Sequence, residues 1–417
     1  MKKYVDINSS INWRKLLPLV QNENVVLLNK PNNEFILAWG SMNRITVNAN
    51  RYDPDRVQHF IDTYPRDYIL GYFAYDLKNN ETRNSYLTES IDSENDLFLV
   101  VPEHVIIKTT KSNLYFGSST LQFINQFISD SESKSDADQK SPSLELKAQT
   151  KKETYLNDIL NIKAQIQNGI IYEMNYCVNF RNQFEQFSPV DTYIKLTNIA
   201  DAPFSAFVND GQNYILSASP ERFLNKRNEL LTSQPIKGTA KRGSNAEKDL
   251  EIKKQLAADP KELSENVMIV DLVRNDLAKV AKKKSVRVEE LCQPYTFKTV
   301  HQLISTISCQ LRPNISFTDM LQALFPMGSM TGAPKISAIS NINQFESFRR
   351  GIYSGAIGYI APNGNFDFNV VIRSILANMA TKQISCGVGG AITINSDPNK
   401  EYEECLLKLK AIQNALC

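Results

Sequence analysis

Two acidic segments contain side chains whose types and spacing suit them to hold a cation. In the segment SDPNKEYEECLLK, Glu401, Glu404 and Lys408 follow at i, i+3 and i+7, so a helix would place all three on one face. Upstream, Glu265 borders an apolar helical stripe, where a carboxylate needs a cation or a hydrogen-bond donor. For the first segment, a solvated, salt-bridged helix surface is the ordinary alternative. These residues alone leave both interpretations open.

The helices that carry these side chains have well-marked beginnings. Asp259–Pro260 and Asp397–Pro398 each supply a capping residue followed by proline at the first helical position, and Glu262 falls where a capping box has its acidic residue. The patterns predict helices over residues 153–168, 246–258, 262–280 and 401–415.

Apolar or alternating runs predict strands in both halves of the chain. Several runs are separated by turns as short as hairpins, which favours an antiparallel or mixed sheet over a repeated βαβ pattern. The expected fold class is therefore α+β. The predicted strands cover residues 24–28, 34–39, 97–101, 212–217, 355–360, 366–372 and 383–388.

Composition describes an ordinary globular protein of 417 residues, 42% hydrophobic, with a formal charge of +2. Such a balance predicts no partner among nucleic acids and no attraction to a membrane. Without a signal peptide or a membrane-spanning run, the chain is expected in the cytoplasm. Its six scattered cysteines predict reduced thiols, with no disulfide framework and no zinc site. A polar stretch from Ile128 onward predicts a linker that divides region 1–148 from region 149–417.

Several segments after residue 150 together resemble the catalytic half of the chorismate-utilising enzymes, the family that includes component I of anthranilate synthase and of aminodeoxychorismate synthase. They occur in the expected order, and chance agreement of so many segments is negligible. In the first half the agreement is weaker and lies chiefly in GYFAYD at 71–76. The segments are SPERF at 219–223, PIKGT at 235–239, ENVMIVDLVRND at 265–276, HQLIST at 301–306, GSMTGAPK at 328–335, YSGAIGY at 353–359, RS at 373–374 and EYEEC at 401–405.

The resemblance implies an anthranilate-synthase-like chorismate-binding fold of packed, mainly antiparallel sheets with outer helices. Residues 1–148 would form the N-terminal region of this fold, and 149–417 the chorismate-binding catalytic region. The segment GSMTGAPK lacks the spacing of a phosphate-binding loop, and we expect it to form a strand-to-helix turn beside the substrate pocket.

The resemblance also implies a Mg²⁺-dependent site. Chorismate carries two carboxylates, which a nearly neutral protein has to hold with a metal ion or with fixed cations. Mg²⁺ typically takes one or two protein carboxylates; by resemblance these are Glu265 and Glu404, with Glu401 nearby.

Further substrate-binding residues follow from the resemblance. Arg373 and Lys408 would meet the other carboxylate, helped by Tyr353 and the backbone near Gly389. Taken alone, Arg373 would be an outward strand residue and Gly389 part of an ordinary turn. The complete predicted set is Gly238, Thr239, Tyr353, Arg373, Gly389 and Lys408.

The motif PIKGT indicates which reaction to expect. Anthranilate synthases usually have alanine where this chain has Lys237, whereas aminodeoxychorismate synthases have a lysine there that acts as a nucleophile on the ring. The resemblance implies that Lys237 adds at C2 while Glu221, as general acid, protonates the departing C4 hydroxyl. Ammonia then adds at C4 and displaces the lysine, which gives 4-amino-4-deoxychorismate, a precursor of 4-aminobenzoate and folate. The alternative is conversion of chorismate and ammonia to anthranilate and pyruvate.

This mechanism sets requirements on two pKa values. A free lysine has a pKa near roughly 10.4, so the environment of Lys237 has to lower it or a base has to take the proton. Glu221 needs a raised pKa in order to be protonated when it acts.

Three points stay open on the sequence. Water-adding relatives carry a lysine base in the segment that here reads IYEMN, and amine-adding relatives usually have glutamine; this chain has Glu173, which argues against water addition but leaves its own role undecided. His301 is flanked by apolar residues and fits a core histidine, whereas the resemblance implies a catalytic residue. No glutaminase motif is evident, so ammonia is expected from solution or from a separate glutamine amidotransferase subunit.

Overall fold

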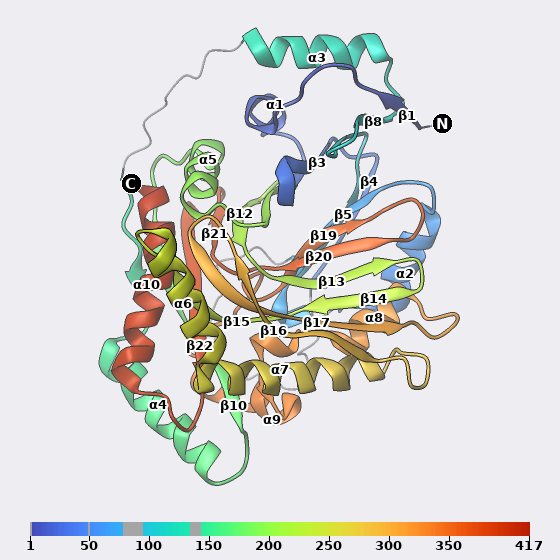
Figure 1. Ribbon diagram of the computed structural model, residues 1–417. Helices are drawn as coiled ribbons and strands as arrows, with labels where there is room; N and C mark the ends of the chain where they lie inside the picture. The colour runs from blue at the N-terminus through green and yellow to red at the C-terminus, as the bar shows by residue number, and fades with distance from the viewer. Residues whose placement is uncertain (1, 49–50, 78–94, 134–142) are drawn as a thin grey trace.

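A computed structural model describes residues 2–48, 51–77, 95–133 and 143–417 of the protein. These residues form two large β-sheets with helices packed around them (Figure 1). Every strand pairing found in the described ranges is antiparallel. The predicted α+β class and the mainly antiparallel sheets are therefore confirmed.

The first sheet runs through the whole molecule and carries part of the candidate site at one end. In pairing order its strands are β1 (Lys3–Asp6), β8 (Asn113–Gly117), β7 (His104–Lys108), β3 (Glu34–Trp39), β2 (Val25–Lys30), β11 (Phe204–Asn209), β12 (Asn213–Ser219), β21 (Ser374–Asn378), β22 (Gln383–Ile392), β10 (Glu173–Gln183) and β18 (Gly332–Ala333), with β9 (Lys147–Ala148) beside β10.

The second sheet faces the first and ends in the strand that carries the PIKGT motif. In pairing order its strands are β15 (Ile236–Lys241), β17 (Val300–Gln310), β14 (Leu230–Gln234), β13 (Arg222–Arg227), β20 (Phe366–Val370), β19 (Ala356–Ile360), β5 (Ile69–Phe73), β6 (Leu97–Val101) and β4 (Asn43–Val47), with β16 (Arg287–Thr296) beside β17.

Helices cover the outer faces of the sheets. Three of them pack together over the first sheet, α4 (Lys152–Gln167), α5 (Pro189–Ala200) and α10 (Pro398–Leu416), and two lie against the β15–β17 end of the second, α6 (Ala246–Ala258) and α7 (Pro260–Ala278) (Figure 1). The others are α1 (Trp13–Val20), α2 (Pro54–Thr63), α3 (Leu121–Ser133), α8 (Phe317–Leu324) and α9 (Lys335–Phe345), with the 3₁₀ turns η1 (Pro31–Asn33) and η4 (Gly328–Met330).

The predicted helix starts are present. The Asp259 side chain accepts hydrogen bonds from two backbone amides of the first turn of α7, at 2.9 and 3.1 Å, and Asp397 accepts one from the first turn of α10, at 3.0 Å. Because each cap is followed by proline, the two helices begin where the sequence indicates.

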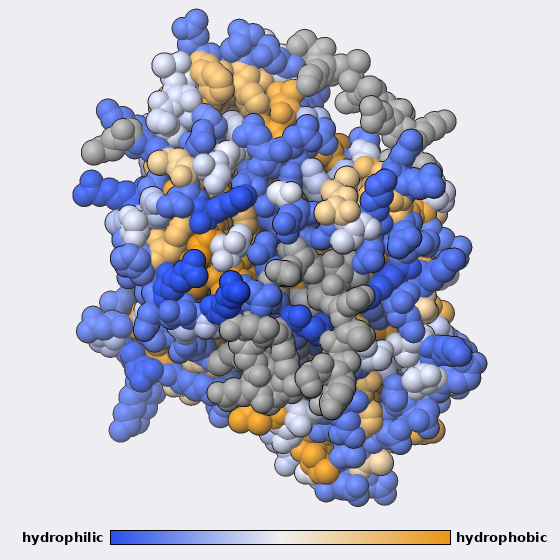
Figure 2. Space-filling model, turned by 180° about the vertical axis from the view of Figure 1, so that it is seen from behind, coloured by the Kyte–Doolittle hydropathy of each residue, from blue (hydrophilic) through white to orange (hydrophobic). Residues whose placement is uncertain are grey.

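The side chains of β2 point alternately into two separate hydrophobic cores. Val26 and Leu28 point into the cluster between the two sheets, whereas Val25 and Leu27 belong to the cluster between the first sheet and its helices. Successive side chains of a strand point to opposite faces, so a strand covered on both faces is apolar at every position. Seen from behind, the molecule is mainly hydrophilic, with apolar residues in separate groups (Figure 2).

The regions before and after residue 148 share both sheets. Strand β2 pairs with β11 in the first sheet, and β5 pairs with β19 in the second. The linker expected from Ile128 does not begin at that residue, because α3 continues to Ser133. Its part from 134 to 142 lies outside the described residues. Within the described ranges, the structure contains no helix both long and apolar enough to cross a bilayer.

Candidate active site

A β-bulge aims Lys237 into the interior. Lys237 and Gly238 of β15 together lie opposite the single residue Leu303 of β17, where the register shifts. Gly238 has φ +87°, and a Cβ there would be 3.1 Å both from the Leu303 side chain and from a carboxylate oxygen of Glu262. The bulge therefore depends on glycine. It re-aims Lys237, whose side chain is 13% exposed.

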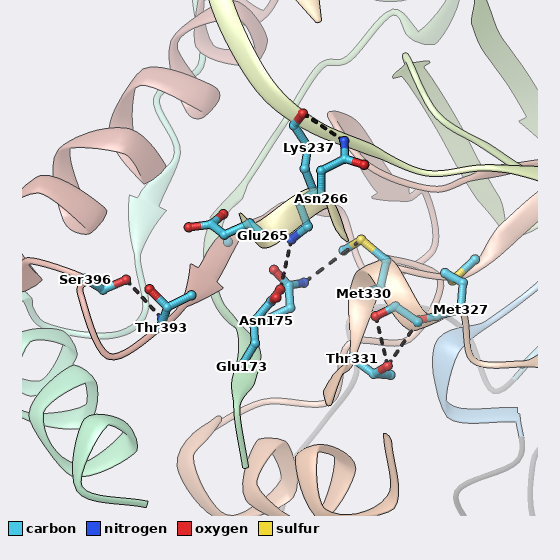
Figure 3. Close-up of polar contacts among 12 residues, drawn as sticks. Glu173, Asn175, Lys237, Glu265, Asn266, Met327, Met330, Thr331, Thr393 and Ser396 are labelled. Atoms are coloured by element: carbon cyan, nitrogen blue, oxygen red, sulfur yellow. Dashed lines mark hydrogen bonds and ion pairs between the residues drawn. The ribbon is translucent and has the colours of Figure 1, made fainter. Parts of the chain in front are cut away.

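The Lys237 ammonium is paired with Glu173, at the start of β10 (Figure 3). Its Nζ lies 3.1 Å from Glu173 Oε1, and the Glu173 side chain is 1% exposed. Burial alone lowers the pKa of Lys237, but the carboxylates of Glu173, Glu265 and Glu221 outweigh it, so the net pKa is raised. Enclosure therefore does not supply the lowered pKa that sequence reasoning allowed for. For the predicted role of Lys237 as nucleophile, this leaves only transfer of its proton to a base.

Glu221 lies in the turn between β12 and β13, beside an apolar pocket lined by Leu277, Leu324 and Met327. Burial raises the pKa of Glu221 to about 7, although a hydrogen bond with Ser329 and the charge of Lys237 act in the opposite direction. This carboxyl group is therefore protonated in a substantial fraction of molecules near neutral pH, as a general acid has to be.

Glu265 and Glu401 bring two carboxylates together from α7 and α10. The Lys261 ammonium lies 3.8 Å from Glu265 Oε1 and 3.7 Å from Glu401 Oε1. Glu265 Oε1 is buried and has no hydrogen-bond partner among the described residues. Burial raises the pKa of Glu265 to about 7, against the charges of Lys237 and Lys261. A buried carboxylate with so little compensation is a place for a further cation.

Lys408 and Glu404 complete the stripe on α10. Lys408 Nζ lies 2.8 Å from Glu404 Oε1 and donates a 2.6 Å hydrogen bond to the Gly389 carbonyl oxygen of β22. A Cβ on Gly390 would lie 3.4 Å from a Glu401 carboxylate oxygen, so the glycines let the helix approach the strand. Glu401 is buried, which excludes a solvated surface for this residue; the Glu404 side chain is 50% exposed.

The carboxylates on α7 and α10 fit the Mg²⁺ that the fold family implies. No group of three or more His, Cys, Asp or Glu side chains in the described part of the chain is arranged as a metal centre. Mg²⁺ needs only one or two protein carboxylates and keeps several waters, so this finding is compatible with its binding. The Glu265 oxygen that accepts no hydrogen bond from a described residue, together with Glu401 and Glu404 around Lys261, supplies the hard oxygen ligands that Mg²⁺ prefers.

Arg373 lies between two strands that belong to different sheets. It joins β20 to β21 with φ +52°, a left-handed conformation that is costly for a residue with a side chain. Burial lowers the pKa of Arg373, although the charge of Glu404 opposes the shift. No hydrogen bond or ion pair of its guanidinium to another described residue is found, which leaves its donors available.

Tyr353 and Thr239 make contacts that the sequence did not indicate. The Tyr353 hydroxyl lies 3.7 Å from Cys177 Sγ, and its ring packs where a Cβ on Gly387 would be 2.4 Å away. Tyr353 thus supports β22 just before Gly389. The Thr239 hydroxyl accepts a 3.3 Å hydrogen bond from the Gln302 side chain.

His301 has both ring nitrogens engaged away from Lys237. Nε2 lies 2.9 Å from Asp249 Oδ1 of α6, and Nδ1 lies 3.1 Å from the Thr296 hydroxyl. The side chain is 1% exposed. These are the contacts of a satisfied buried histidine, and its catalytic role stays a prediction.

Sequence reasoning missed the buried pair of Glu346 and Arg350. The Arg350 guanidinium binds Glu346 at 2.6 and 2.9 Å and donates hydrogen bonds to the backbone carbonyl oxygens of Met330 and Asn175, at 2.6 and 2.7 Å. It also lies 4.5 Å from the ring centroid of Tyr75. The pair therefore ties GSMTGAPK to the strand of Glu173. Only the cluster of charges near YSGAIGY hints at it in the sequence.

The segment GSMTGAPK forms η4, β18 and the start of α9, next to the site. Ala333 of β18 pairs with Glu173, and a Cβ on Gly332 would lie 2.2 Å from the Glu173 carbonyl oxygen. The predicted strand-to-helix turn is thus present, with Ser329 of η4 beside Glu221.

Comparison with known proteins identifies the family of this chain. Residues 22–414 match the model of the chorismate binding enzyme family. The chain belongs to this family of chorismate binding enzymes.

Among its relatives, the chloroplastic aminodeoxychorismate synthase of Arabidopsis thaliana is 41% identical over 268 residues, which cover 64% of this chain and 29% of the relative. Aminodeoxychorismate synthase component 1 of Klebsiella aerogenes is 37% identical over 270 residues, 65% of this chain and 59% of the relative. The alignments thus span less than two thirds of either relative.

Two solved structures share the fold. Anthranilate synthase component I from Streptococcus pneumoniae superposes with a TM-score of 0.78 at 23% identity, over 92% of each chain. MenF, the menaquinone-specific isochorismate synthase from Escherichia coli, gives a TM-score of 0.79 at 18% identity, over 100% of this chain and 95% of that one. The expected anthranilate-synthase-like architecture is confirmed.

Proposed function

We propose that this chain is the synthase component of an aminodeoxychorismate synthase, which converts chorismate and ammonia to 4-amino-4-deoxychorismate. The observation that carries the proposal is the largely enclosed amine of Lys237 at the bulge of β15, with Glu221 close enough for their charges to interact. An amine in this position supplies the nucleophile that an alanine lacks. The similarity to aminodeoxychorismate synthases supports the same reaction.

In the proposed reaction Lys237 acts as the nucleophile and Glu221 as the general acid. Lys237, once neutral, forms a bond from Nζ to C2 of chorismate while the ring double bonds shift and the C4 to oxygen bond breaks. Glu221 gives its proton to the departing hydroxyl, which leaves as water. Ammonia then bonds to C4, the double bonds shift back, and the Lys237 amine leaves from C2. Glu221 regains a proton from solvent.

Substrate binding falls to residues on α7, on α10 and in the segment that joins β20 to β21. We propose that Glu265 and Glu404 hold Mg²⁺, with Glu401 beside them; the bound ion supplies positive charge for one substrate carboxylate. Arg373 and Lys408 would bind the other. Since Arg373 has no partner among the described residues, it requires no bond to be broken before it meets an anion.

A second polypeptide is expected to supply ammonia. Relatives that share this region are named component 1, which implies a further component. We propose that a glutamine amidotransferase subunit is this partner, and that the isolated chain uses ammonium but not glutamine.

Mass analysis of the product tests the proposed function. Purified protein incubated with chorismate, ammonium and Mg²⁺ is expected to form 4-amino-4-deoxychorismate without releasing pyruvate. Formation of anthranilate with an equal amount of pyruvate would assign the alternative reaction. No consumption of chorismate would contradict both.

A further inference from the structure

The salt bridge between Lys237 and Glu173 suggests a role for a residue that the mechanism above does not use. Nζ and Oε1 are 3.1 Å apart, within proton-transfer reach; the Glu173 side chain is buried and the Lys237 side chain is largely enclosed. Glu173 Oε2 has no hydrogen-bond partner among the described residues. One oxygen of this carboxylate thus contacts the lysine, and the other has no competing donor in that part of the chain.

We propose that Glu173 is the proton acceptor that converts the Lys237 ammonium into the free amine before it attacks the ring. The inference rests on the proposed role of Lys237 as nucleophile. In this step the Nζ to H bond breaks, an H to Oε1 bond forms, and the ion pair becomes a neutral amine beside a neutral carboxylic acid. When the amine is released from C2 at the end of the cycle, the proton returns from Glu173.

The local geometry holds the acceptor in place. Glu173 begins β10 and pairs with Ala333 of β18, where Gly332 packs onto the Glu173 backbone. The guanidinium of Arg350 binds backbone carbonyl oxygens of both β10 and η4, the turn that precedes β18. The carboxylate is therefore presented from a strand clamped on two sides, while the lysine is presented from the opposite sheet.

Other carboxylates face Lys237, and none contacts it. They are Glu221 in the β12–β13 turn, Glu262 and Glu265 on α7, and Glu404 on α10, with Lys261 as the nearby cation. These charges stabilise the ammonium at a distance, whereas Glu173 alone among the described residues forms an ion pair with it. The usual glutamine of aminating relatives accepts a hydrogen bond from the amine but cannot take its proton. Glu173→Gln is therefore the decisive variant.

The test measures the rate of the Lys237 adduct by quenched intact mass, with chorismate and Mg²⁺ and without ammonia, between about pH 6 and 8. In the wild-type protein the proton moves inside the pair, so this step adds no pH dependence. In Glu173→Gln it has to leave to solvent, and the free-amine fraction then rises about tenfold per pH unit below the pKa of the amine. At about pH 6 the wild-type protein is expected to be about 10²-fold or more faster than the variant. This ratio of the two rates should then fall about tenfold for each pH unit up to about pH 8.

Two further variants make the result decisive. Glu173→Asp keeps a carboxylate and should retain the wild-type pH dependence at a lower rate, even if Glu173→Gln fails to fold. Glu262→Gln removes a charge that faces Lys237 without contacting it, and its ratio to wild type should be the same at every pH.

Three results would overturn the inference. The first is a ratio of wild-type to Glu173→Gln rates that does not change with pH. The second is a Glu173→Gln variant that is faster than the wild-type protein at every pH. The third is a Glu173→Asp variant whose ratio to wild type changes about tenfold per pH unit. Absence of any adduct in the wild-type protein would instead refute Lys237 as nucleophile, and with it both proposals.

Discussion

The guanidinium of Arg350 lies 2.6 Å from the Glu346 carboxylate, and each side chain is only 1% exposed. An ion pair this deeply buried leaves an uncompensated charge if one partner is removed. The expected cost of Arg350→Met is about 3–5 kcal/mol in the free energy of unfolding, measured by urea denaturation. Arg274→Met, at an exposed ion pair with Asp271, is the control and should cost about 1 kcal/mol or less.

The double replacement of Arg350 by Met and Glu346 by Leu removes both charges. It should recover part of the lost stability, because no unpaired charge stays buried. A double variant that is less stable than Arg350→Met would contradict this account of the pair.

Lys237→Ala should abolish covalent capture of the substrate. With the nucleophile absent, formation of 4-amino-4-deoxychorismate is expected to fall at least about 10³-fold, while chorismate still binds, and residual amination should shift toward C2 and anthranilate-like products. Intact mass and product chromatography measure the two effects. Lys241→Ala, at an exposed position of the same strand, serves as the control and should behave as wild type. If the alanine variant kept the parental rate, Lys237 would only shape the pocket.

Glu221→Gln should remove one limb of the pH profile. Because burial raises the pKa of Glu221 to about 7, the protonated acid is abundant below about pH 7 and is depleted above it. Adduct formation by the wild-type protein is therefore expected to decline above that pH. The variant should be about 10²–10⁴-fold slower and should lack this decline. An unchanged alkaline limb in the variant would assign it to another group.

The same shift predicts the sign of a stability effect. A carboxyl group with a raised pKa in the folded state binds its proton more tightly there than in the unfolded chain. The folded state therefore loses stability as pH rises from about 4.5 to about 7, the interval between the ordinary value and the value for Glu221. Denaturation of Glu221→Gln across this interval should show a smaller loss than the wild-type protein.

Glu265→Gln and Glu404→Gln should weaken Mg²⁺ binding. Each change removes one of the few anionic ligands available to a hard cation, so Mg²⁺ affinity measured by calorimetry is expected to fall at least about tenfold, and chorismate affinity with it. Glu403→Gln, exposed on the same helix as Glu404, is the control and should bind Mg²⁺ normally. Unchanged affinity in both ligand variants would disprove the metal assignment.

Helix caps and short turns could be recognised in the sequence, because each is determined by residues close together in the chain. The Asp-Pro starts of α7 and α10 placed Glu265 and Glu401 correctly on their helices. Hairpin-length turns predicted antiparallel strands near the C-terminal end, such as β19 with β20. In each case the physical cause lies within a few residues of its effect.

Contacts over long sequence separations were not predictable in the same way. The pairing of Lys237 with Glu173 joins the two sheets across 64 positions of the sequence. No pattern in the residues next to either one predicts this contact. The bulge at Gly238 is defined by the register of β15 against β17. The glycine by itself therefore does not predict it. Likewise, Asp249 from α6 engages His301, which explains why flanking residues could not decide between a core and a catalytic role.

The order in which the strands are synthesised bears on how this protein can fold. In the second sheet, β19 and β20 lie between β5 and β13, so the early strands have no permanent neighbour on that side until residues 356–370 have left the ribosome. The first sheet likewise cannot be completed until β21 and β22 are synthesised, because these two strands lie between β12 and β10. Pairings this distant in sequence form slowly and leave strand edges exposed meanwhile. We therefore expect the nascent chain to depend on chaperones, and shortening at its C-terminal end to prevent folding rather than merely remove the residues of α10.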